Sequence, residues 1–228
     1  MRQFLTYLAV MCICTAAASA QTTVRRAVSA SGTATVSVTP DQAEIDLGVV
    51  TTATSASDAA SQNATQTAAM IAQVQMVLGT SGTIKTISYS LTPNYSYPNN
   101  QSPVLTGFTA TNVIAVTTNN LTLVGKLIDA GVNGGSNKVQ SLQFTLQDDT
   151  SARTQALQAA AKKAQSDASA IAAGLGLHTG GVIAANEGST VTPIVVSAAP
   201  PPASTTTPIV VGNLTVSATV SIQVELTN

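Results

Sequence analysis

The sequence is poor in the residues on which catalysis most often depends. Its 228 residues include two cysteines and one histidine, and tryptophan is absent. Cys12 and Cys14 both fall in a predicted leader, so the mature chain would have no disulfide or thiolate, although export would permit disulfides. A Ser-His-Asp site would have to use His178, and no G-x-S-x-G motif occurs. Because His178 follows a long helical pattern, we predict a solvated or helix-capping role for it.

Metal and phosphate sites are equally poorly supported. With one histidine, a metal site would need carboxylates alone, and the candidates have simpler explanations. Glu44 and Asp46 fit the wet face of a strand, and Asp148 and Asp149 fit a helix N-terminus. The glycines of 131–135 precede a strand pattern, whereas a phosphate-binding loop leads into a helix. We therefore predict no enzyme activity, no catalytic residues, and no metal or cofactor.

Charge is also scarce. Charged residues make up 8% of the chain, which has nine basic and ten acidic residues and a formal net charge of −1. Removal of the leader, with Arg2, would leave eight basic residues and a charge of −2. This chain has no basic footprint for nucleic acid and no polybasic segment for anionic lipid. No stretch after the leader is apolar enough to span a membrane as a helix.

Residues 1–20 have the organisation of a secretory signal peptide. Arg2 supplies the positive start, Phe4–Cys14 the apolar run, and Ala18-Ser19-Ala20 a cleavage site after Ala20. The apolar run is shorter than the roughly 18 residues of a membrane span. The predicted location is the periplasm. Secretion, or a lipid anchor on Cys12 or Cys14, is the alternative.

Alternating residues predict a hairpin over Val28–Val50. From Val28 to Val38 every even position is small or apolar and every odd position is Ser or Thr. This period of two is typical of a half-buried strand. Residues 39–42, Thr-Pro-Asp-Gln, favour a turn, and 43–50 would return beside the first strand.

Helical spacing occurs in three stretches. Ser55–Leu78 begins with a capping-box pattern, Ser55 and Asp58, and is followed by Gly79. A shorter helix follows Asn119 or Asn120 and ends near Gly131. A third helix, over 150–175, has an inner face made mostly of alanine, followed by isoleucine and leucine. Because alanine has little side chain to bury, this helix must lie close to whatever it covers.

The remaining stretches predict strands and one long loop. Strands are expected over 84–97, 107–118, 139–146, 180–188 and 214–226. The two end strands should share a sheet, and residues 189–208, which include Pro200-Pro201-Pro202, read as an extended loop. The predicted fold is α+β: an antiparallel sheet of long strands with about three helices packed on it, in the order ββαββαβαββ. Residues 28–228 would form one domain, after a short tail at 21–27.

A series of short motifs also runs through the chain in a fixed order. They are Val28–Ala34, Pro40–Ala43, Leu47–Val49, Pro93–Tyr97, Gly107–Asn112, Gly174–Gly176 after the alanine-rich helix, and Leu214–Ala218. This series resembles the SIMPL-domain family, the bacterial periplasmic group that includes oxidative-stress-defence and periplasmic immunogenic proteins. The resemblance implies an exported domain that self-associates, has no catalytic residues to transfer, and in some members is linked to envelope or oxidative stress. The helices here are rich in Ala, Ser, Thr and Gln, unlike the Glu- and Lys-rich helices usual in the family, so charge-mediated partners are not carried over.

Apolar residues at two places are candidates for contacts with other molecules. Aromatic residues are only 3% of the chain, yet Tyr89, Tyr95, Tyr97 and Phe108 fall on or near one predicted hairpin. They favour the hairpin core or a subunit contact over a ligand cage. Ile194, Val195 and Val196 form an apolar run in the Pro-rich loop. We therefore predict a non-catalytic, self-assembling structural or interaction protein, a homo-oligomer. The alternative is a ligand-binding module that uses the aromatic hairpin Tyr89–Phe108.

Overall fold

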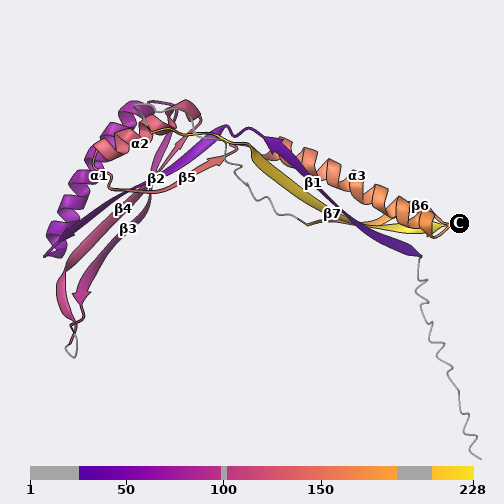
Figure 1. Ribbon diagram of the computed structural model, residues 1–228, viewed down its shortest axis with the longest axis horizontal. Helices are drawn as coiled ribbons and strands as arrows, with labels where there is room; N and C mark the ends of the chain where they lie inside the picture. Colours follow the sequence, from indigo (N-terminus) through magenta and orange to yellow (C-terminus); the bar gives the residue numbers. More distant parts are fainter. Residues whose placement is uncertain (1–25, 99–101, 189–206) are drawn as a thin grey trace, which may run out of the picture.

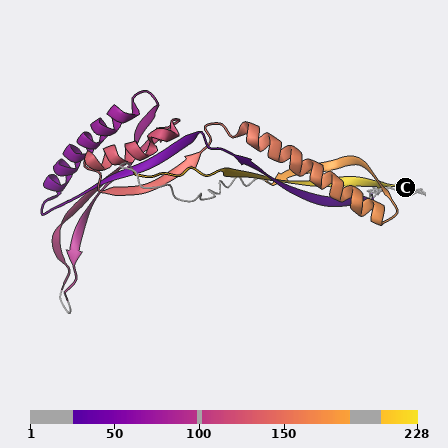
Figure 2. The ribbon, with the colours of Figure 1, turned by 45° about the horizontal axis from the view of Figure 1, so that its top comes forward.

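The molecule is elongated and has two lobes, each a sheet with helices on one face (Figures 1 and 2). The computed structural model describes residues 26–98, 102–188 and 207–228. In chain order its elements are β1 (Ala27–Val38), β2 (Gln42–Ala53), α1 (Ala56–Leu78), β3 (Gly82–Ser96), β4 (Val104–Thr118), a 3-10 turn (Leu121–Leu123), α2 (Val124–Asn133), β5 (Lys138–Thr145), α3 (Thr150–Gly174), β6 (His178–Gly188) and β7 (Leu214–Thr227). The first lobe has strand order β3-β4-β2-β5, and the second has β1-β7-β6. The α+β class and the predicted element order are confirmed.

The strands are divided between two sheets, where a single sheet was predicted. The predicted pairing of the two end strands is confirmed, since β1 pairs with β7 along all its twelve residues. The predicted hairpin over 28–50 is wrong, because β2 pairs with β4 and β5 instead of β1. A period of two fixes the buried face of a strand but not its neighbour. The Pro40 turn therefore carries the chain from one sheet to the other, and Asp41 N–H donates to the carbonyl of Thr145.

A buried asparagine docks α1 onto the sheet of the first lobe. Asn63 is fully buried, and its Nδ2 donates to the carbonyl oxygens of Val49 in β2 (2.8 Å) and Ala110 in β4 (3.1 Å). The helix is thereby fixed over the seam between these two strands. The predicted cap is confirmed, because Ser55 Oγ accepts from Asp58 N–H. The core around it contains Ala43, Ile45, Leu47, Val49, Met70, Val74, Leu78, Ile114, Val116, Val124, Leu127, Ile128, Phe144 and Leu214.

The second lobe depends on very close packing of α3. Its buried residues are alanines spaced four apart: Ala152, Ala156, Ala160, Ala164, Ala168 and Ala172. Four helical residues rise about 6 Å, and two strand residues rise about 6.6 Å. Because these two spacings are similar, successive alanines of α3 can lie over successive inward-facing residues of β1 and β7. A Cβ added at Gly32 would overlap the carbonyl oxygen of Ala160 and lie 2.5 Å from Ala164 N. The predicted close approach of this helix is confirmed.

Two details of that helix differ from the prediction. Ile171 and Leu175 were expected on the inner face but are 44% and 63% exposed. The four-residue spacing instead continues to Ala172, and the helix ends one residue earlier, at Gly174. The larger apolar residues at the end of α3 are therefore exposed, and the alanine is buried. The smaller residue is buried because the sheet lies too close for a larger one.

The two lobes are joined by short segments that pack on both cores. Leu146 contacts the core of each lobe, and Gln147 N–H donates to the Asp41 carboxylate at 2.7 Å. Leu214, the first residue of β7, is still part of the first lobe's core. Ahead of it, the N–H and hydroxyl of Thr207 both donate to the Asp129 carboxylate on α2. The last strand is thus anchored in one lobe before it crosses into the other.

Gly32→Val should destabilise the fold by about 2 kcal/mol or more, because the new side chain must displace the backbone of α3. Urea unfolding followed by circular dichroism measures the change. Ser29→Val, on the exposed face of the same strand, is the matched control and should change stability by less than about 0.5 kcal/mol. An equally small effect at Gly32 would contradict the close packing of α3 on β1.

Candidate functional site

The β3–β4 hairpin extends beyond the rest of its sheet (Figure 1). Pairing of β4 with β2 ends at Phe108, opposite Ala53, whereas pairing of β4 with β3 continues to Val104. At Gly107, where the two-stranded part begins, a Cβ would lie 2.6 Å from the carbonyl oxygen of Ala53. We call residues 87–97 and 104–108 the hairpin arm.

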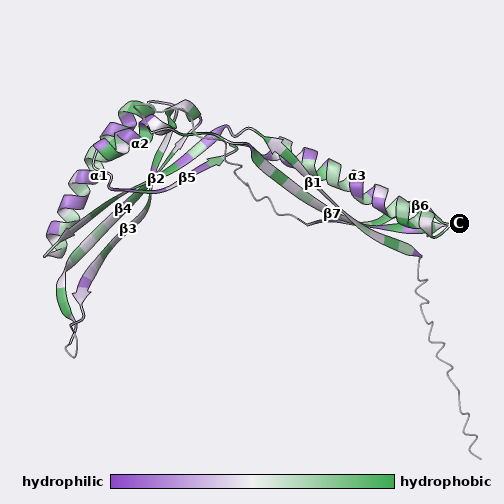
Figure 3. Ribbon diagram, in the orientation of Figure 1, coloured by the Kyte–Doolittle hydropathy of each residue, from purple (hydrophilic) through white to green (hydrophobic). Residues whose placement is uncertain are grey.

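The hairpin arm exposes apolar side chains out toward its tip, and the hydropathy colouring shows apolar residues there (Figure 3). The exposed fractions of its three tyrosines are 54% for Tyr89, 49% for Tyr95 and 73% for Tyr97. Phe108, at the base, is half-buried. The sequence favoured the hairpin core or a subunit contact for these aromatics. The tyrosines are exposed in the single chain, and the subunit contact stays a prediction.

The outer part of the hairpin arm, beyond Phe108, runs past the start of α1 at Ala56 and has no helix over it. Tyr89 and Leu91 lie further in, on the edge strand β3, beside the part of β4 that α1 contacts through Asn63.

Four more exposed apolar residues lie on the arm and were not among the predicted site residues. These are Ile87, Val104 and Leu105, each about half exposed, and Leu91, which is 38% exposed. Ile87 and Leu91 fall in the alternating pattern of the predicted strand 84–97, which predicts burial on one face, and Val104 and Leu105 precede the predicted strand 107–118. Irregular pairing near Ile87 and near Tyr95 interrupts that alternation, and no residue type in the sequence marks those positions. With these residues, both strands of the arm carry exposed apolar side chains.

Polar side chains at the base hold the two strands of the arm together. Asn94 Nδ2 donates to Thr109 Oγ1 at 2.8 Å, and the Thr106 hydroxyl donates to the carbonyl oxygen of Asn94 at 3.0 Å. Thr109 and Thr52 of β2 also share a hydrogen bond. These contacts fix the arm to the sheet. Its exposed aromatics are consequently presented on an ordered strand pair, which reduces the entropy lost on binding.

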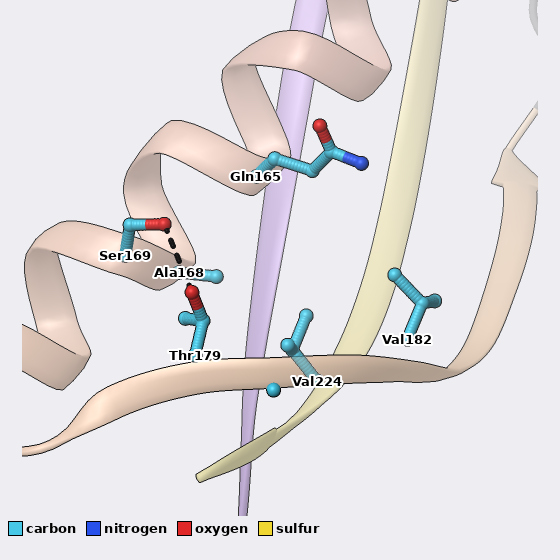
Figure 4. Close-up of a pocket in the computed structure, with 7 residues that line it drawn as sticks. Gln165, Ala168, Ser169, Thr179, Val182 and Val224 are labelled. Atoms are coloured by element: carbon cyan, nitrogen blue, oxygen red, sulfur yellow. Dashed lines mark hydrogen bonds between the residues drawn. The ribbon is translucent and has the colours of Figure 1, made fainter. Parts of the chain in front are cut away.

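Two hollows in the surface are lined by other residues. The first, of about 190 Å³, lies between α3 and β6. There Gln165 and Ser169 of α3 face Thr179 and Val182 of β6 (Figure 4), and Ser169 and Thr179 share a hydrogen bond. It has no charged lining residue and is smaller than the usual 300–1,000 Å³ ligand pocket. The second hollow, at the end of the first lobe's sheet, is lined by Thr80, Ser81, Gly82, Thr83, Asn119 and Asn120.

The other polar candidates from the sequence lie apart from the hairpin arm. Asp46 Oδ2 accepts from the Ser141 hydroxyl, and Asp46 Oδ1 is buried without a partner. At the start of α3, Thr150 N–H donates to the Asp148 carboxylate, whereas Asp149 makes no side-chain cap bond. The bonds from the Thr150 hydroxyl and N–H also hold the pKa of the Asp148 carboxyl below its usual value. His178 is exposed at the start of β6. The predicted contact residues Ile194, Val195 and Val196 lie outside the described residues.

Clustered metal ligands and membrane-spanning helices are both absent from the part of the chain that the structure describes. Across residues 26–98, 102–188 and 207–228, no group of three or more His, Cys, Asp or Glu side chains could hold a metal ion. None of the helices in those same ranges is long and apolar enough to cross a membrane.

The fold and surface define a two-lobed α+β protein with an exposed apolar hairpin. Comparison with protein families gives a match over residues 28–224 to the SIMPL family, described as a protein of unknown function (DUF541). Because the match covers most of the sequence, the chain belongs to this family, as the motifs predicted. No curated protein matches the chain.

Changing Tyr89, Tyr95 and Tyr97 together to Ser should leave the free energy of unfolding of the monomer within about 1 kcal/mol of the original, because exposed side chains contribute little to folding. Ile114→Ala, in the core beneath α1, should cost about 2–5 kcal/mol. Urea unfolding at low protein concentration compares the two. A loss as large in the tyrosine variant as in Ile114→Ala would show that the arm is packed inside the folded chain.

Proposed function

We propose that this SIMPL-family chain is an exported, non-catalytic interaction protein that assembles with copies of itself through the hairpin arm. The observation that carries the proposal is the set of exposed apolar side chains on the arm, with Tyr89, Tyr95 and Tyr97 between 49% and 73% exposed. Clusters of exposed apolar side chains of this kind mark interaction sites in soluble proteins.

The composition of the arm is suited to contact with protein. Tyrosine is enriched in protein interfaces, and charged residues are depleted at their centres. The arm has no charged residue in either of its strands, so two copies can approach without repulsion between like charges. Its threonine and asparagine bonds keep it ordered before contact, which lowers the entropic cost of association.

Export to the periplasm is supported by the signal-peptide pattern of residues 1–20. The link to envelope or oxidative stress is supported by the family resemblance and by no residue of this chain. Binding of a small ligand is less well supported. The tyrosines form an open strip instead of a cage, and the two hollows described above are lined by other residues.

Light scattering of the purified chain at several concentrations should give a mass of at least two copies. A variant with Tyr95→Ser and Tyr97→Ser should lose copies, because it removes the apolar surface. The matched control, Ile171→Ser with Leu175→Ser, removes comparably exposed apolar groups from α3 and should keep the original mass. Polar substitution of Ile194–Val196 tests the loop in the same way.

A monomer at every concentration would contradict self-assembly. A multimer that persists in the Tyr95 and Tyr97 variant but is lost in the loop variant would instead place the contact in the Pro-rich loop.

A further inference from the structure

The outer edge of β3 has a row of unused backbone hydrogen-bonding groups. In the described part of the chain β3 is an edge strand that pairs only with β4. Its pairing is irregular between Thr86 and Ser88 and again between Asn94 and Tyr95, but residues 88–94 between these points pair regularly. In such a run, successive residues direct their N–H and C=O groups alternately toward one neighbour and the other.

Two observations fix which residues of this run point outward. The carbonyl oxygen of Asn94 accepts from the Thr106 side chain on β4, so the even-numbered residues face β4. Pro93, which has no N–H to donate, must be one of the residues that face away, as prolines in edge strands do. Tyr89 and Leu91 therefore direct both their N–H and C=O groups to the open edge.

Over residues 88–92 this edge lacks the features that usually prevent edge-to-edge pairing, although irregular pairing lies on both sides of the run and Pro93 follows it. Natural edge strands are protected by charges, bulges, short length or a covering element. The run 88–92 has no charged residue, no proline and no irregular pairing. On the other edges the following protections occur. The pairing of β5 is irregular opposite Asp46 and Leu47, and that of β6 is irregular at two places. The edge strand β1 lies beneath α3.

The run is also symmetric about its middle residue. Ser90 has an apolar residue on either side, Tyr89 and Leu91, and beyond these a hydroxyl residue on either side, Ser88 and Thr92. An antiparallel pair of two identical strands centred on Ser90 would therefore place hydroxyl opposite hydroxyl and apolar opposite apolar. This self-complementarity is what a two-fold interface between identical subunits requires, and it identifies a second copy of the chain as the partner.

We propose that β3 pairs antiparallel with β3 of a second copy about a two-fold axis at Ser90; this rests on the self-assembly proposed above and names its contact. Tyr89 of each chain and Leu91 of the other exchange two N–H···O=C bonds, four in all, and their side chains pack together on the face that α1 covers. Aromatic–aliphatic pairs of this kind stabilise sheets. The two four-stranded sheets become one continuous sheet.

The geometry makes cross-linking a direct test. The two Ser90 residues would form a non-hydrogen-bonded pair with Cα atoms about 4.5 Å apart, close enough for a disulfide. The two Thr92 residues would be displaced by four positions, about 13 Å, which is too far for one. Cys12 and Cys14 are first changed to Ser, so that each introduced cysteine is the only one in the chain.

Under mild oxidation, Ser90→Cys should give a disulfide-linked dimer at least about ten times faster than Thr92→Cys. Independently, Leu91→Pro removes an outward N–H and leaves the pairing with β4 in place, so it should abolish the contact and lower the mass measured by light scattering. Circular dichroism checks that each variant is folded.

Equal cross-linking of the two cysteine variants, or an unchanged mass in Leu91→Pro, would overturn the edge pairing. If the chain is a multimer whose mass falls in the Tyr95 and Tyr97 variant while either of those results holds, self-assembly through the arm stands and only the edge pairing is wrong. A monomeric original chain would overturn both.

Discussion

The reach of α1 over its sheet decides which residues of the first lobe form a core and which form a surface. The helix is docked by Asn63, whose amide bonds carbonyl groups of both β2 and β4. Strand residues beneath it, such as Ile114 and Leu47, are fully buried. The pairing of β3 with β4 continues past the start of the helix, and Tyr95, Val104 and Leu105 are exposed there. The interaction surface is thus the uncovered continuation of the core strands.

In the second lobe a different kind of helix covers the sheet. An alanine-lined helix buries little apolar area for each residue, so it contributes to stability only if it lies in close contact with the sheet. Gly32 provides that contact, since the backbone of α3 occupies the space of a side chain there. Leu146 then packs against the cores of both lobes. The result is an elongated molecule that holds the hairpin arm far from the second lobe (Figure 1).

Local features of this chain were predictable from the sequence, and long-range pairing was less so. The Ser55 cap, the alternation in Val28–Val38 and the alanine face of α3 depend on nearest neighbours, and all were confirmed. The hairpin over 28–50 was wrong because alternation does not specify a partner strand. Exposure on the arm was not predictable, because it depends on β3 being the edge of its sheet and on where α1 begins, and both are set by segments distant in sequence. The tyrosine cluster was visible as composition, but only the structure shows that it is exposed and lies beside an open edge.

Hydrogen exchange at the amides of Tyr89 and Leu91, measured by NMR across a range of protein concentrations, tests the central claim most directly. These two N–H groups face outward, so nothing in the described part of the single chain protects them. If β3 pairs with a second copy, their exchange should slow as concentration rises, while Ser90, already bonded to β4, should change much less. Fast exchange of both amides at every concentration would contradict the account.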